Sequence, residues 1–138
     1  MTPRENPPHI ELGVRGEETA CEILIRKGYK LLDRNWRFGH LELDLVCERA
    51  GEIVFVEVKT RTSTICGGPL AGLTPKKIRN LALAAQAWIN ANEAWDLPCR
   101  MDVITLTRSG PDYIMEHFIN AIELSHTLDS SHSAGEYW

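Results

Sequence analysis

Residues 41–61, LELDLVCERAGEIVFVEVKTR, contain the pattern that says most about the fold of this chain. Apolar residues alternate along 41–48 and again along 53–60, as in two strands, and the Arg-Ala-Gly-Glu segment between them is typical of a hairpin turn. A turn of four residues pairs residue 48 with residue 53 and thereby assigns a partner to the other residues of both strands. A loop one residue longer or shorter would shift this pairing and change which side chains face each other.

The predicted pairing brings charged side chains together. Asp44 lies opposite Glu57 in this register. Glu42 lies opposite Lys59 on the same side of the hairpin, because alternate residues of a strand share a face. Two opposed carboxylates repel each other, and a divalent cation bound between them removes the repulsion. Because oxygen ligands suit them, Mg²⁺ or Mn²⁺ is the expected cation. The other face is expected to be core and carries Leu41, Leu43, Leu45, Cys47, Val54, Val56 and Val58.

Lys59 adds a cation to the same face. Its ammonium group would lie near the metal-bound water and the scissile phosphate, where it would stabilise developing negative charge or help to poise the nucleophile. The alternative is an edge hairpin with a solvated polar side, in which Glu42 and Lys59 form a surface ion pair of little energetic value. The residue pattern alone leaves both interpretations open, because short patterns recur by chance.

The rest of the chain predicts an α/β fold in which a central mixed sheet is flanked by helices. Apolar residues at near-helical spacing indicate two helices, and Thr74 followed by Pro75 is a typical helix start. The expected elements are a helix at 10–27, strands at 29–36, 41–48 and 53–60, a helix at 75–92 and strands at 100–108 and 112–119.

Length and composition indicate one globular domain. The chain has 138 residues, of which 43% are hydrophobic and 25% charged. We expect 1–8 to form a flexible lead-in, 9–124 a single nuclease-like domain and 125–138 a loose tail. The sequence has neither a signal peptide nor an apolar run long enough to span a membrane, which favours a cytoplasmic protein without membrane contact. Its four cysteines form no C-x-x-C pair, so we expect free thiols, mostly buried.

The distribution of charge is uneven. The formal net charge of −4 argues against a protein that coats nucleic acid by bulk attraction. Between residues 58 and 92, however, the chain has no acid and carries Lys59, Arg61, Lys76, Lys77 and Arg79. This segment is consistent with a surface that faces phosphate, and equally with a solvated basic helix end.

Five blocks of the sequence carry a resemblance to a known family. In order and spacing, RGEETACEILIRKGYKLLDRNWR, LELDLVCE, VFVEVKTR, GGPLAGLTPKKIRNL and RMDVITL resemble the YraN-type family of small bacterial endonucleases. That family belongs to the restriction-endonuclease-like, PD-(D/E)XK nuclease superfamily and is similar to archaeal Holliday junction resolvases. The likeness covers about residues 13–107. It implies a restriction-endonuclease-like fold and a metal-dependent endonuclease that hydrolyses phosphodiester bonds in DNA, with branched DNA among the substrates.

The resemblance also implies roles for single residues. Asp44, Glu57 and the Val58 carbonyl would hold the metal. Glu17 would lie near the metal directly or through water, whereas without the resemblance it is interpreted as an acid favoured by the dipole of a helix N-terminus. The candidate catalytic residues are Asp44, Glu57, Lys59, Glu17 and Glu42.

Basic residues near these acids are candidates for contact with DNA. Lys77 matches the family's lysine at the start of the second long helix, where a cation and a helix N-terminus suit a phosphate. The candidate substrate-binding residues are Lys77, Arg61 and Arg37. Arg100 and Asp102 match a further family block and are expected to be structural, as an ion pair where a strand begins.

Two functions from different classes remain at this stage. The first is a divalent-metal-dependent nuclease whose partner is DNA. The second is a non-catalytic nucleic-acid-binding or adaptor module that keeps the nuclease fold, which would show salt-dependent DNA binding without a metal effect. A homodimer is an option for an enzyme that handles two strands.

Overall fold

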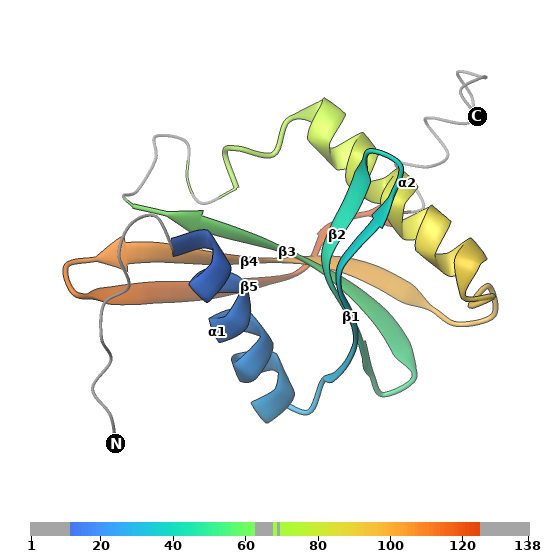
Figure 1. Ribbon diagram of the computed structural model, residues 1–138, viewed down its shortest axis with the longest axis horizontal. Helices are drawn as coiled ribbons and strands as arrows, with labels where there is room; N and C mark the ends of the chain where they lie inside the picture. The colour runs from blue at the N-terminus through green and yellow to red at the C-terminus, as the bar shows by residue number, and fades with distance from the viewer. Residues whose placement is uncertain (1–11, 63–67, 69, 125–138) are drawn as a thin grey trace.

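The computed structural model describes residues 12–62, 68 and 70–124, which form one five-stranded sheet with a helix on each face (Figure 1). The order of the elements is the predicted one, and the α/β fold with a central mixed sheet is confirmed. The predicted lead-in, 1–8, and tail, 125–138, lie outside the described residues. The elements are α1 (Leu12–Arg26), β1 (Lys30–Phe38), β2 (Leu41–Arg49), β3 (Glu52–Arg61), α2 (Pro75–Ala91), β4 (Cys99–Ser109) and β5 (Asp112–Ile122).

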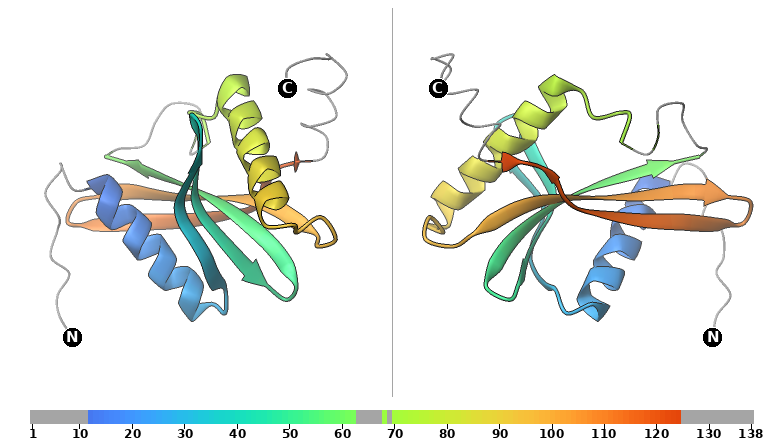
Figure 2. Two further views of the ribbon diagram at one scale, coloured as in Figure 1. Left: turned by 45° about the vertical axis from the view of Figure 1, so that its right-hand side comes forward. Right: turned by 180° about the vertical axis from the view of Figure 1, so that it is seen from behind.

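The sheet has the strand order β1-β2-β3-β4-β5. All neighbours are antiparallel except β3 and β4, which are parallel and are connected through α2. A parallel pair needs such a crossover, and the helix in it covers one face of the sheet. Figure 2 shows α1 and α2 on opposite sides of the strands.

The turn between β2 and β3 produces the predicted register. Ala50 and Gly51 occupy its two central positions with φ values of 53° and 82°, the left-handed conformation that tight hairpin turns favour. Arg49 pairs with Glu52, and the pairing continues as predicted. It ends at the pair Leu45 and Val56, just before the charged residues begin. The hairpin therefore opens at the position of the predicted site.

Both faces of the sheet are buried, which corrects the prediction of one core face. Val46 and Phe55 lie on the side predicted to be polar, yet they pack beneath α2, where the Phe55 ring meets the Trp88 ring edge-on at 5.8 Å. Leu43 joins the same cluster, although its alternate neighbour Leu45 faces α1. The reason is that helices cover both faces. The α1 side contains Ala20, Leu24, Leu45, Cys47, Val54, Val56, Ile104 and Leu106.

The start of α2 and the described cysteines are as the sequence predicted. The Thr74 hydroxyl accepts a hydrogen bond from the Lys77 amide at 3.1 Å, and Pro75 is the first helical residue. Cys21 and Cys47 are buried free thiols. Cys66 lies outside the described residues. Among the described residues, neither helix is long and apolar enough to cross a membrane.

Candidate active site

The candidate site begins where β2 separates from β3. Beyond the last regular pair of the two strands, Asp44 Oδ2 accepts a hydrogen bond from the Val58 backbone amide at 2.8 Å. The Asp44 side chain thus provides the acceptor that a β2 carbonyl would otherwise provide for the Val58 amide of β3. Regular pairing of Asp44 with Glu57 does not occur, but their carboxyl groups are in hydrogen-bonding contact. We call these two groups the acid pair.

In the acid pair, Glu57 is buried and Asp44 is half-buried, and the two carboxyl groups oppose each other's ionisation. The Glu57 side chain is 7% exposed. Burial, followed by the charge of Asp44, raises the pKa of Glu57 to about 7. Burial also raises the pKa of Asp44, although the hydrogen bond from the Val58 amide opposes this shift. The pair therefore tends to hold a proton near neutral pH rather than two full negative charges.

Glu17 is brought to the acid pair by a close contact between α1 and β3. Gly16 is buried, and a Cβ atom added there would lie only 2.6 Å from Thr60 Oγ1. A residue without a side chain therefore allows the helix to approach the strand. Burial, followed by the charge of Asp44, raises the pKa of Glu17, which places this carboxyl group within electrostatic reach of the pair.

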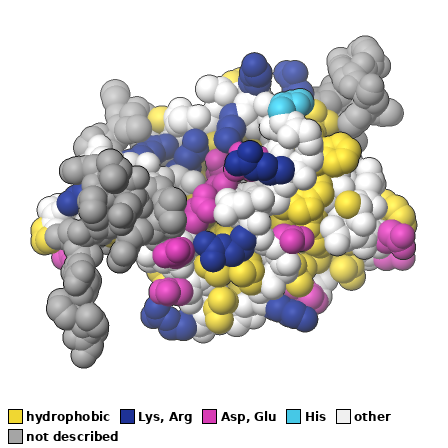
Figure 3. All heavy atoms as spheres, in the orientation of Figure 1, with side chains coloured by type: hydrophobic (Ala, Val, Ile, Leu, Met, Phe, Trp, Pro, Cys, Tyr) yellow, Lys and Arg dark blue, Asp and Glu magenta, His cyan; other side chains and the backbone are white. Residues whose placement is uncertain are grey.

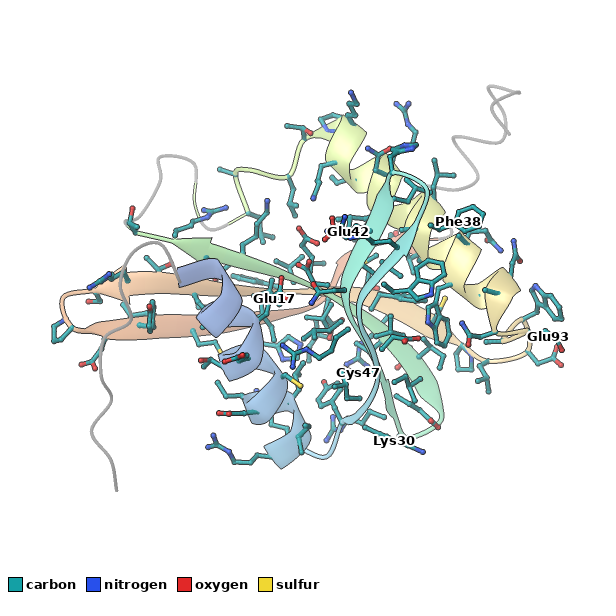
Figure 4. All side chains as sticks on the ribbon, in the orientation of Figure 1. Glu17, Lys30, Phe38, Glu42, Cys47 and Glu93 are labelled. Carbon is teal, nitrogen blue, oxygen red and sulfur yellow. The ribbon has the colours of Figure 1, made fainter. Side chains whose placement is uncertain are left out.

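Glu42 lies at the exposed margin of the site. Its charge also raises the pKa of Asp44. Figure 4 shows Glu17 on α1 and Glu42 on β2. The predicted pair of Glu42 with Lys59 is wrong, because Glu42 Oε2 instead lies 3.5 Å from Arg37 NH2. The reason is that β2 pairs with β3 only from Leu45 toward the turn. Glu42 lies outside this paired part, and its cross-strand partner is Arg37 on β1.

The cation that contacts the acid pair comes from α2. Lys77 Nζ lies 3.4 Å from Glu57 Oε2. Lys59 is half-buried, and its charge also lowers the pKa of Glu57. Arg61 is buried and donates a hydrogen bond to the Gly68 carbonyl at 3.2 Å. In Figure 3, acidic side chains gather near the middle of one face, with Lys and Arg side chains around them.

The donor set fits a hard divalent cation. Within 12–62, 68 and 70–124, no group of three or more His, Cys, Asp or Glu side chains is arranged to hold a metal ion. Magnesium needs fewer, because it keeps several waters and is often bound through one or two carboxylates. The acid pair, two adjacent carboxyl groups with raised pKa values, provides such a set. Asp44 and Glu57, with the Val58 carbonyl, are the residues that would hold it.

A second carboxylate cluster lies elsewhere in the sheet, and most of its members were not predicted. Asp102 is fully buried, and its oxygens lie 2.9 Å from Arg100 Nε, 2.8 Å from His117 Nε2 and 2.8 Å from the Asn120 amide. Burial opposes ionisation, but these partners together lower the pKa of Asp102. Arg100 also bonds Glu52 at 2.8 Å. The predicted structural ion pair of Arg100 and Asp102 is confirmed.

Sequence comparison places this arrangement in a family. Residues 16–106 match the family model described as "Uncharacterised protein family UPF0102". The chain belongs to this family. The match confirms the resemblance to YraN-type proteins and includes every candidate site residue. UPF0102 members from two bacteria are similar over most of their length.

The UPF0102 protein of Nitratidesulfovibrio vulgaris strain DP4 is 41% identical over 126 residues, which cover 91% of this chain and 94% of that protein. That of Syntrophomonas wolfei is 44% identical over 111 residues, covering 80% and 96%. The solved structure of Pyrococcus furiosus SfsA in complex with Ca²⁺ has 16% identity, covers 80% of this chain and 65% of that chain, and gives a TM-score of 0.41, too low to support an argument.

Proposed function

We propose that this UPF0102 protein is a divalent-metal-dependent endonuclease that hydrolyses phosphodiester bonds in DNA through a restriction-endonuclease-like site. The observation that supports the proposal is the acid pair, with Glu57 buried and Asp44 half-buried, and with Lys59 and Lys77 beside it. Two carboxyl groups weaken the attraction of a surface for phosphate, so a protein that only binds DNA gains nothing from them. A nuclease gains a cation site next to the phosphate.

Each residue of the site has a role in this proposal. Asp44 and Glu57, with the Val58 carbonyl, hold Mg²⁺ or Mn²⁺. Such a cation would supply Lewis-acid activation of water and neutralise charge on the phosphate. The hydrogen bond from the Val58 amide fixes the Asp44 carboxylate in one orientation. The Lys59 ammonium stabilises negative charge that develops on the scissile phosphate.

The outer residues serve binding. Glu17 and Glu42 add negative charge around the acid pair and would contact the cation through water. Arg37 is exposed and would contact a DNA phosphate, while Arg61 would add positive charge at the end of β3. Lys77 would contact a phosphate at the N-terminus of α2, where the helix dipole favours an anion.

The test compares Asp44→Asn and Glu57→Gln with the wild type on labelled linear duplex, single-stranded and four-way-junction DNA, with Mn²⁺ or Mg²⁺. Both variants should lose cleavage by about 100-fold or more, because each removes a charged ligand. Glu48→Gln is the matched control, since Glu48 lies on the same strand and pairs with Ile53 near the turn. Thermal unfolding verifies that all variants are folded.

Undiminished cleavage by Asp44→Asn and Glu57→Gln would reject this site. Salt-dependent DNA binding by the wild type, without cleavage and without any effect of Mn²⁺, would indicate the non-catalytic binding module instead.

A further inference from the structure

The acid pair has an unexpected counter-ion. Lys59 is two residues from Glu57 on the same strand, yet the ammonium found 3.4 Å from Glu57 Oε2 is that of Lys77, from the first turn of α2. Lys77 is 43% exposed in its side chain, whereas Glu57 is 7% exposed. A half-exposed cation therefore closes the solvent side of a buried acid.

We propose that Lys77 is an exchangeable counter-cation of the acid pair. Without metal, its ammonium group neutralises Glu57. When a divalent cation binds the pair, the ammonium is released and contacts a DNA phosphate. The inference rests on the proposed metal-dependent function and adds a regulatory property to the same site: metal occupancy controls whether Lys77 can bind DNA.

Such an exchange requires movement of the Lys77 side chain but not of the helix. The Lys77 amide donates a hydrogen bond to the Thr74 hydroxyl at 3.1 Å, so the start of the helix is held independently of the Lys77 side chain. The ammonium is 3.4 Å from Glu57 and its side chain is half-exposed, so water screens the pair and limits its energy. A doubly charged ion between the two carboxylates of the acid pair interacts far more strongly with them than a single ammonium at the margin. Metal binding is therefore expected to displace Lys77 from Glu57.

The released side chain has a suitable destination. The first turn of α2 contains no acidic residue, and Lys76 and Arg79 are exposed beside Lys77. Phosphate is favoured at this helix end by the dipole and by these cations. If metal binding frees Lys77 to bind DNA, thermodynamic linkage requires that DNA binding also strengthens metal binding. The two ligands then raise each other's affinity.

The first measurement is calorimetric titration of Mn²⁺ into the wild type, Lys77→Met, Lys77→Arg and Lys76→Met. Lys77→Met should bind Mn²⁺ about 3-fold to 5-fold more tightly, because no ammonium competes for Glu57. Lys77→Arg keeps the charge and should stay near the wild-type affinity. Lys76→Met removes a charge from the same helix turn without removing the contact to Glu57, and should change affinity less than about twofold.

The second measurement is fluorescence anisotropy with a labelled DNA duplex of about thirty base pairs, in EDTA and in Ca²⁺, which replaces Mn²⁺ to limit cleavage. Lys77→Met should weaken DNA binding about 5-fold to 10-fold in Ca²⁺ and less than about twofold in EDTA. Equal losses in both conditions would show a lysine that always contacts DNA and would overturn the exchange.

Failure of the inference can be distinguished from failure of the proposed function. If the wild type binds Mn²⁺ and Lys77→Met binds it equally or more weakly, the exchange is overturned but the metal site is supported. Mn²⁺ binding by none of the four proteins would overturn both.

Discussion

Two carboxylate clusters of the same sheet behave in opposite ways. Asp102 is surrounded by donors from Arg100, His117 and the backbone of β5, and its pKa lies below the ordinary value. Glu57 is buried as well, but it faces the half-buried Asp44, and the pKa values of both members of the acid pair are raised. Burial is common to Asp102 and Glu57, so their partners account for the difference.

The comparison separates a carboxylate whose partners all come from the protein from a pair that the proposed function assigns to a metal ion. A buried carboxylate whose donors are all supplied by the protein is stable as an anion and needs no ligand. Among the described residues, the two carboxyl groups of the acid pair have only one amide donor and one half-exposed lysine as partners. Some of their oxygens therefore accept no hydrogen bond, and their negative charges repel each other. Such a pair favours the binding of a cation or a proton. Three predictions test this distinction, in order of expected effect.

The largest effect is expected from Asp102→Asn. It removes the fully buried one of the two carboxylates that pair with Arg100 and leaves only Glu52, and breaking such a buried pair should lower the free energy of unfolding by about 3–5 kcal/mol. Urea denaturation at neutral pH measures the loss. The exposed Asp96→Asn is the control and should change stability by less than about 0.5 kcal/mol. A loss below about 1 kcal/mol for Asp102→Asn would show that the cluster is not structural.

A smaller effect, opposite in sign, is expected from Glu57→Gln without metal. Because the folded pKa is raised from 4.5 to about 7, the folded chain binds the proton more tightly than the unfolded chain. Glu57 therefore makes stability fall as pH rises between these values. Glu57→Gln should remove this loss and stabilise the protein at pH 8, relative to pH 5, by about 2–3 kcal/mol.

Urea denaturation of the wild type and Glu57→Gln at both pH values, in EDTA, measures this slope. Asp102 adds no slope in this window, because its stabilisation is present above the ordinary Asp pKa and is lost only as pH falls through its lower folded value. Parallel pH profiles for the two proteins would contradict the raised pKa of Glu57.

The smallest effect is expected from Arg37→Met. Arg37 and Glu42 form a pair at 3.5 Å with side chains 70% and 45% exposed, so its loss should change the free energy of unfolding by less than about 0.5 kcal/mol. The same denaturation experiment measures it. A loss above about 1 kcal/mol would show that this exposed ion pair contributes more to stability than surface pairs ordinarily do.

The β2–β3 hairpin was predictable because its signals are local. Alternation has a period of two residues, and Ala-Gly at the turn adopts the backbone that the register needs. The start of α2 was predictable for the same reason, since Thr74 and Pro75 act within one turn. The register of the hairpin is the feature that brings Asp44 and Glu57 to the same end of the two strands.

The ion partners were less predictable. Strand alternation indicated Glu42 with Lys59, but the pairing of β2 with β3 stops before these residues. Where pairing stops depends on the path of β2 along β1, which no single strand encodes. The donors around Asp102 were missed because the pairing of β4 with β5 shifts register between Met101 and Val103, and simple alternation does not predict which β5 residues then meet Asp102.

The amino-acid sequence alone specifies the order of elements, the register of the β2–β3 hairpin and the identity of the acid pair, because these depend on contacts a few residues apart. Tertiary packing specifies which cation meets the pair. Lys77 reaches Glu57 only after α2 has docked on the sheet, and docking depends on how its apolar residues pack against Phe55 and Val46. Side chains from separate elements are placed by the whole core, and no local pattern reports that arrangement.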